Sequence, residues 1–314
     1  MKIGTIGGIA LSTALGCGAP AAGSPAASAD PGIAETTVRV GAQEVRYLHA
    51  GSDPTTVVLI HGWPESSRAW RHVMPRLARR YRVIAPDLRG IGGTSAPAPE
   101  YAKAALARDV HELVATLGAQ RVFVIGHDIG GIVAYAYARL YPAEVKGVAI
   151  LDIPVPGTKP WDDVSASPHA WHYRFHDQKP LAEKLVMGRQ FTYFRSFIDA
   201  HAVHPEAMSD PDVEAYAAAY GSPASLTAGF ELYRAFGDDT VFGRSHAEPL
   251  EIPILLAGAD HSVASLEPAQ AEALRQLGAR NVQIATIPDS GHYVAEENPA
   301  ATADAIETFI RGVP

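Results

Sequence analysis

One short segment holds the residues best suited to chemistry, Gly126-His127-Asp128-Ile129-Gly130-Gly131. An apolar run precedes it and a helical pattern begins near Ile129, so a tight strand–turn–helix would lift Asp128 above a sheet. This is the pattern Gly-x-Ser-x-Gly with aspartate in place of serine. A carboxylate at that point can attack an electrophilic carbon and form an ester. The alternative is an aspartate that only caps the helix.

Two further segments carry complementary groups. His61-Gly62-Trp63-Pro64 follows an apolar run, and the N–H groups of Trp63 and Ile129 are placed to form an oxyanion hole. The alternative for this segment is an ordinary turn after a strand. Pro288-Asp289-Ser290-Gly291-His292 follows the last apolar run, and His292 is the candidate general base. The order of oxyanion loop, nucleophile and histidine is a stronger signal than any one of the three.

Two aspartates are candidates for the acid that orients His292. Asp152 ends one predicted strand and Asp260 ends the next, in Ala257-Gly258-Ala259-Asp260. Both strand ends could neighbour the histidine loop, so the residues alone leave both open. Loss of the true acid should cost far more than loss of the other, because it orients the imidazole and stabilises its charged form.

The elements that must position these groups follow from the apolar runs. Short, β-branched runs alternate with segments of helical spacing, which predicts an α/β fold with a mostly parallel sheet covered on both faces. The runs are residues 57–60, 82–85, 122–125, 145–151, 254–256 and 282–287. In such sheets ligands bind beyond the carboxyl ends of the strands, where the candidate residues stand.

One stretch breaks the alternation. Residues 154–248 contain no convincing buried strand and are rich in aromatic residues, His and Ala. We therefore expect a core of residues 30–153 and 249–314 with a helical cap, residues 154–248, inserted over the crevice.

The first 29 residues have the pattern of a secretory signal peptide. A short positive start, Met1-Lys2, precedes an apolar stretch too short to span a bilayer, and Ala27-Ser28-Ala29 fits a signal-peptidase site. We expect an exported protein, periplasmic or secreted. Cys17, the single cysteine, sits in a context similar to a lipoprotein box. The alternative is an N-terminal extension that carries no targeting signal.

Composition limits the partners. Hydrophobic residues make up 47% of the 314 residues and charged residues 19%, which is typical of a globular protein. With 26 Lys and Arg against 34 Asp and Glu, the net charge is −8. A chain without a basic run is a poor candidate for nucleic acid binding. We expect no nucleic acid partner and no membrane span.

These motifs together resemble the α/β-hydrolase superfamily, in particular its aspartate-nucleophile branch of epoxide hydrolases and dehalogenases. The resemblance covers residues 36–312 and includes the Pro86-Asp87-Leu88-Arg89-Gly90 loop, in which we take Asp87 to be structural. The chain contains no Gly-x-Ser-x-Gly, which disfavours a serine esterase or lipase.

Two motifs in the predicted cap make the chain similar to one subgroup of this branch. Trp171-His172 and Phe230-Glu231-Leu232-Tyr233-Arg234 look like cap motifs of epoxide hydrolases, and the chain resembles a secreted bacterial subgroup that uses one His and one Tyr to open the ring. That resemblance implies His172 and Tyr233 as donors to the epoxide oxygen. It favours Asp152 as the acid, since the subgroup carries its acid 24 residues after the nucleophile (152 − 128 = 24). Asp260 resembles the arrangement of most epoxide hydrolases.

The resemblance implies a reaction in two steps. Asp128 attacks an epoxide carbon, and water activated by His292 then hydrolyses the ester to a vicinal diol. The substrate is a small epoxide, and no cofactor or metal is required. A metal pair of His172 with His176 lacks a third ligand in the sequence. Related secreted enzymes point to a homodimer.

Two rival functions remain. Haloalkane dehalogenases commonly carry Trp after the nucleophile, and fluoroacetate dehalogenases carry Arg one and four residues after it. This chain has Ile129 and Ile132 there, and its Trp171-His172 replaces their His-Trp. A non-catalytic secreted binding protein would lack the nucleophile, the base or the acid, and none is missing.

Overall fold

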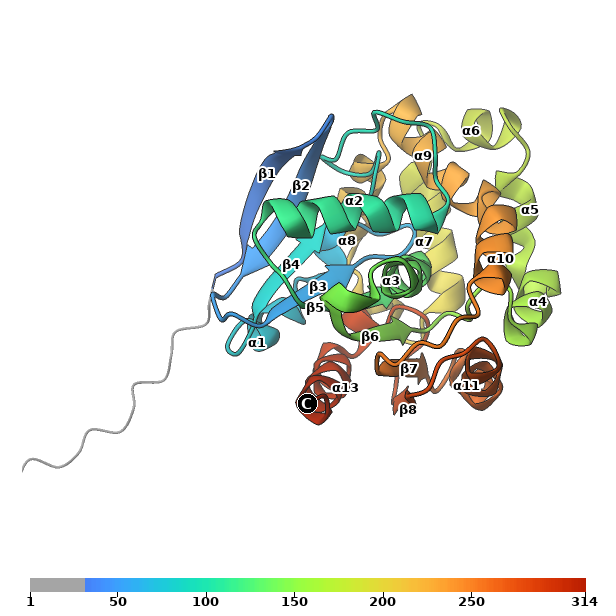
Figure 1. Cartoon of the computed structure of the whole chain (residues 1–314). Helices are drawn as coiled ribbons and strands as arrows, with labels where there is room; N and C mark the ends of the chain where they lie inside the picture. Colours follow the sequence, from blue (N-terminus) through green and yellow to red (C-terminus); the bar gives the residue numbers. More distant parts are fainter. Residues whose placement is uncertain (1–31) are drawn as a thin grey trace, which may run out of the picture.

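The computed structural model describes residues 32–314 and contains one eight-stranded sheet in the order β1-β2-β4-β3-β5-β6-β7-β8 (Figure 1). β1 is antiparallel to β2 and β2 to β4, while the remaining neighbours are parallel. The strands are β1 (Ala34–Val40), β2 (Gln43–Ala50), β3 (Thr56–Ile60), β4 (Arg82–Pro86), β5 (Val122–His127), β6 (Val145–Leu151), β7 (Ile254–Ala259) and β8 (Val282–Ile287). The predicted signal peptide and Cys17 lie outside the described residues.

The six predicted strands are confirmed as β3 to β8. The central strands β3, β5 and β7 are buried along their whole length, which is why they read as continuous apolar runs. The N-terminal hairpin of β1 and β2 was not predicted. β1 is mostly exposed and carries charged and Thr side chains, so it lacks the apolar signal of the central strands.

Helices cover both faces of the sheet (Figure 1). Apolar side chains of three helices pack with one face of the sheet, and those of three others pack with the opposite face. The first group is α2 (Lys103–Thr116), α3 (Ile129–Leu140) and α11 (Glu267–Gln276), and the second is α1 (Met74–Leu77), α12 (Val294–Glu297) and α13 (Pro299–Gly312). This double cover makes the centre of the sheet a rigid base for the residues at its carboxyl edge.

Between β6 and β7 the chain forms helices and no strand, as predicted for the cap. These helices lie together beside the carboxyl edge of the sheet in Figure 1. They are α4 (Lys159–Ala166), α5 (Trp171–His176), α6 (Leu181–Val186), α7 (Gln190–His201), α8 (Asp210–Ala219), α9 (Pro223–Arg234) and α10 (Phe236–Ser245). An aromatic cluster packs where they meet the core, with Trp63 from the core in contact with Phe194, Phe197 and Tyr233 of the cap.

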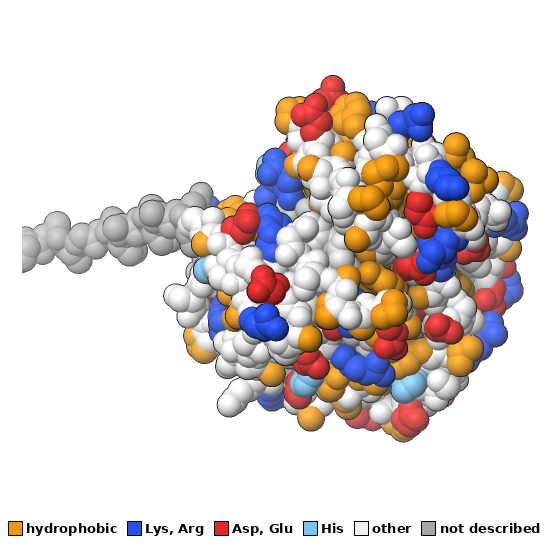
Figure 2. All heavy atoms as spheres, turned by 90° about the horizontal axis from the view of Figure 1, so that it is seen from above, with side chains coloured by type: hydrophobic (Ala, Val, Ile, Leu, Met, Phe, Trp, Pro, Cys, Tyr) orange, Lys and Arg blue, Asp and Glu red, His pale blue; other side chains and the backbone are white. Residues whose placement is uncertain are grey.

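The surface carries charges of both signs. On the face seen in Figure 2, basic and acidic side chains are interspersed, so that face carries no continuous basic patch. Within residues 32–314, no helix is long and apolar enough to cross a membrane.

Candidate active site

Asp128 stands at the sharp turn between β5 and α3. Its φ of +48° is in a region that side-chain-bearing residues rarely adopt, and such strain is typical of functional sites. The turn leaves no room for side chains nearby: a Cβ added to Gly62 would lie 2.7 Å from the Asp128 Cβ. The strand–turn–helix predicted from the sequence is therefore present, and glycine is required where the oxyanion loop passes Asp128.

The Asp128 carboxylate faces the neighbouring loops and does not cap α3. No hydrogen bond joins this side chain to the first turn of α3, so the capping interpretation is wrong. The Trp63 N–H donates to Asp128 Oδ2 at 3.0 Å, and His292 Nε2 lies 3.9 Å from Oδ1. In the described chain, Ile129 N–H makes no hydrogen bond to this carboxylate, and its place in the oxyanion hole stays a prediction. The nucleophile candidate is thus held between one oxyanion-loop donor and the candidate base.

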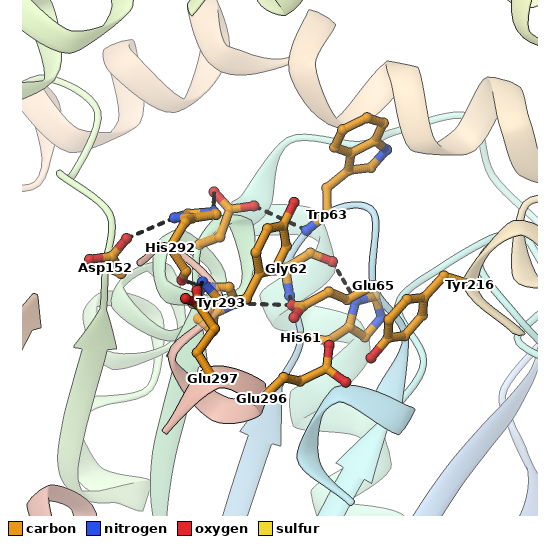
Figure 3. Close-up of polar contacts among 12 residues, drawn as sticks. His61, Gly62, Trp63, Glu65, Asp152, Tyr216, His292, Tyr293, Glu296 and Glu297 are labelled. Carbon is orange, nitrogen blue, oxygen red and sulfur yellow. Dashed lines mark hydrogen bonds and ion pairs between the residues drawn. The ribbon is translucent and has the colours of Figure 1, made fainter. Parts of the chain in front are cut away.

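Asp152 is the acid that contacts His292. His292 Nδ1 lies 2.7 Å from Asp152 Oδ2 (Figure 3), and the Asp152 carboxylate also accepts Ala259 N–H at 2.8 Å and the Ser262 hydroxyl at 2.7 Å. Burial opposes the charge on His292, but the hydrogen bond to the Asp152 carboxylate and the charges of Asp128 and Asp152 together raise the pKa of His292 above its usual value. The pair has the base–acid geometry of a hydrolytic triad.

Asp260, the alternative acid, binds the backbone of the loop that carries His292 instead. Its carboxylate accepts the backbone N–H groups of Asp289 at 2.9 Å and Ser290 at 3.2 Å, which lowers its pKa. It makes no contact with the His292 ring in the described part of the chain. Asp87 is buried and paired with Arg46 Nη1 at 2.6 Å, away from Asp128, as a structural residue would be.

The predicted cap donors lie together above the core residues. The rings of His172 and Tyr233 are 5.4 Å apart, both side chains are buried, and both line the same cavity as Asp128. Burial, helped by the nearby His201 and His292, lowers the pKa of His172 to about 3, so its imidazole is neutral at ordinary pH. Burial and the Asp128 charge raise the pKa of Tyr233 well above 10. Both groups therefore keep a proton to donate.

The cavity between core and cap has a volume of about 480 Å³. Its walls are mostly aromatic and aliphatic, and neither Lys nor Arg is among the described residues that line it. No group of three His, Cys, Asp or Glu within residues 32–314 is arranged to hold a metal ion. His176, considered as a metal partner of His172, instead has its Nε2 2.9 Å from the Tyr193 hydroxyl.

Sequence reasoning missed a buried lysine behind Tyr233. Lys103, at the start of α2 in the core, pairs with Asp239 of the cap at 2.7 Å and donates to the Leu232 carbonyl. Leu232 directly precedes Tyr233, so this buried charge ties the Tyr233 segment to the core. Tyr173 was also missed, although it follows His172 and lines the cavity. A lone Lys in an Ala-rich helix gave no sequence signal of this partnership.

Comparisons with known proteins show the family to which the chain belongs. Residues 55–299 match the family described as alpha/beta hydrolase fold. The chain is 34% identical over 277 residues to the soluble epoxide hydrolase of a Corynebacterium species, covering 86% of this chain and 94% of that protein. It is 30% identical over 295 residues to the fluoroacetate dehalogenase of a Burkholderia species, covering 89% and 94%.

A solved structure repeats the architecture. The epoxide hydrolase CorEH, determined without ligand, superposes with a TM-score of 0.81 at 32% identity, covering 90% of this chain and 100% of that one. The family match spans most of the described residues. The chain belongs to the α/β-hydrolase family, with epoxide hydrolases among its relatives.

Proposed function

We propose that this hydrolase is an epoxide hydrolase that works through a covalent ester on Asp128. The observation that carries the proposal is that one cavity is lined by Asp128, by His292 at 3.9 Å from its carboxylate, and by two proton-bearing cap residues, His172 and Tyr233. The similarity to epoxide hydrolases supports it.

In the first step an Asp128 oxygen forms a bond to an epoxide carbon, and the carbon–oxygen bond of the ring breaks. The electron pair goes to the departing oxygen, which His172 and Tyr233 stabilise as its charge develops. One of the two transfers its proton to that oxygen. The product of this step is a hydroxyalkyl ester on Asp128.

In the second step His292 Nε2 takes a proton from water, and the hydroxide attacks the ester carbonyl. The Trp63 N–H, which already binds Asp128 Oδ2, would stabilise the tetrahedral oxyanion, with Ile129 N–H as the second donor. Collapse releases the diol oxygen, which receives the proton from His292. The proton left on Asp128 returns through solvent to the cap donor.

A dehalogenase is the second candidate because of the similarity to fluoroacetate dehalogenase. The positions one and four residues after Asp128 are Ile129 and Ile132, both buried in the core, and no Lys or Arg of the described chain lines the cavity. A substrate carboxylate would meet no permanent cation there, which favours an uncharged epoxide.

The test uses His292→Gln, which should form the ester but hydrolyse it slowly. The purified variant is incubated with panels of small epoxides and of halogenated compounds, and intact-protein mass spectrometry detects the adduct. We expect a mass increase equal to the whole epoxide, mapped to Asp128, and none in the control Asp128→Asn/His292→Gln. An adduct only from a halogenated compound, lighter by the lost halogen, would assign the dehalogenase function.

A further inference from the structure

Behind the candidate triad lies a buried ion pair that the reaction above does not use. Glu65, in the loop after β3, and His127, the last residue of β5, are each about 1% exposed, and Glu65 Oε2 lies 2.9 Å from His127 Nδ1. Buried charges are costly unless they are paired and hydrogen-bonded. A pair kept at this place calls for an explanation.

The hydrogen bonds of this pair require a doubly protonated imidazole. His127 Nδ1 faces the Glu65 carboxylate, and its Nε2 lies 2.7 Å from the backbone carbonyl oxygen of His292. Both neighbours can only accept, so both ring nitrogens must donate. Burial opposes the charge, but the Glu65 carboxylate, with contributions from Asp128 and Asp152, raises the pKa of His127 to about 9. The ring is therefore a fixed imidazolium at neutral pH.

The pair joins three catalytic segments. Glu65 Oε2 also accepts the Gly62 N–H at 2.9 Å, and Gly62 precedes the Trp63 N–H that binds Asp128 (Figure 3). His127 directly precedes Asp128 and holds the carbonyl of His292. Two side chains thus connect the oxyanion loop, the nucleophile turn and the loop of the base.

The cation also acts on the base electrostatically. The rings of His127 and His292 have centroids 4.9 Å apart, and the His127 charge lowers the pKa of His292, against the raising effect of Asp152. The charged or titratable groups that face His127 are Glu65, Asp128, Asp152, His292, His61 and Tyr293. A cation here favours the neutral form of the base, which is the form that the reaction needs.

We propose that Glu65 and His127 are positioning residues: their ion pair aligns the oxyanion loop with the base, and the charge of the imidazolium disfavours protonation of His292. The expected effect on reaction rate rests on the proposed function. The charge of His127 and the alignment of the loops can be measured in the protein without substrate. The test therefore starts with measurements that need no substrate.

The first measurement is ¹⁵N NMR of histidine-labelled protein across pH. In the unaltered protein we expect both His127 nitrogens to be protonated at pH 7, with titration near pH 9. In His127→Gln, which can still donate to the His292 carbonyl but carries no charge, the His292 titration should move to higher pH. The control His111→Gln removes a histidine from a second His–Glu pair, with Glu144 at 2.9 Å, outside the cavity, and should leave the His292 titration unchanged.

The second measurement is the decay of the ester in His127→Gln after loading with an epoxide. Misplacement of a catalytic group by about 1 Å costs on the order of 10²-fold in rate, so we expect ester decay to slow by that order. The acidic limb of its pH–rate profile should also move to higher pH. A singly protonated His127 at pH 7, or a His292 titration that stays or moves to lower pH in His127→Gln, would overturn the proposal. Glu65→Gln provides a second variant, in which His127 should titrate well below pH 9. If no epoxide reacts but the NMR results hold, the proposed function fails and this inference stands.

Discussion

Replacing Asp152 by Asn separates the two candidate acids. Asp152 Oδ2 accepts from His292 Nδ1 and from the Ser262 hydroxyl, both at 2.7 Å. An amide would present N–H donors to these partners, so the imidazole would adopt the tautomer in which Nε2 carries the proton and cannot act as a base. The same change in a serine protease triad lowers kcat by about 10⁴-fold, which corresponds to about 5 kcal/mol. We expect a loss of that order in ester hydrolysis.

The matched control is Asp260→Asn. Its amide oxygen can still accept one of the two backbone N–H groups, and one such bond is worth about 1 kcal/mol, so hydrolysis should fall less than about tenfold. Single-turnover mixing with an epoxide, followed by quenching and mass spectrometry, measures formation and decay of the ester separately. NMR titration should also show a lowered His292 pKa in Asp152→Asn alone. An Asp260 variant as damaged as the Asp152 variant, or an Asp152 variant within tenfold of the unaltered protein, would refute the assignment.

Four further single substitutions test the cap and the buried ionisable groups. Tyr233→Phe and His172→Gln should each slow ester formation by about 10²–10³-fold but leave its decay nearly unchanged in the same quench assay; equal slowing of both steps would indicate a packing defect. Lys103→Met strands the buried Asp239 charge and should lower the free energy of unfolding in urea by about 3–5 kcal/mol, with most of the loss recovered in Lys103→Met/Asp239→Leu; a loss below about 1 kcal/mol would contradict this role. Burial, with a contribution from the Asp152 charge, raises the pKa of Glu267 to about 8. From its ordinary value up to about 8 the folded state keeps a proton that the unfolded state loses, so stability falls as pH rises through that window, and thermal melts of Glu267→Gln should lack this slope.

The sequence predicted best what depends on neighbouring residues. The turn at Asp128 needs an apolar strand, small residues and a helix in immediate succession, and all three can be read from one segment. The strands β3 to β8 were equally clear, since burial on both faces makes them continuously apolar. The hairpin of β1 and β2 was missed because only part of it packs against the core, so its side chains carry little apolar signal.

Contacts between distant segments could not be predicted from the sequence. Asp152 and Asp260 end adjacent strands, and only the loop geometry shows that the first reaches the ring of His292 while the second holds the backbone of the same loop. The Lys103–Asp239 pair joins residues 136 positions apart, and the Glu65–His127 pair joins residues 62 apart. No local pattern encodes such pairs, because each partner alone looks like an ordinary polar residue of a loop or a helix.

The two layers of the site divide the proposed reaction between them. The cap contributes His172 and Tyr233, which act on the oxygen released when the ring opens, whereas the core contributes His292 and Asp152, which act on water in the second step. Asp128 takes part in both. Cap substitutions should therefore change the rate at which the ester appears, and core substitutions the rate at which it disappears. If a cap variant accumulated ester as a His292 variant does, the cap residues would have to act on hydrolysis, and the division of roles argued from their places in the cavity would be wrong.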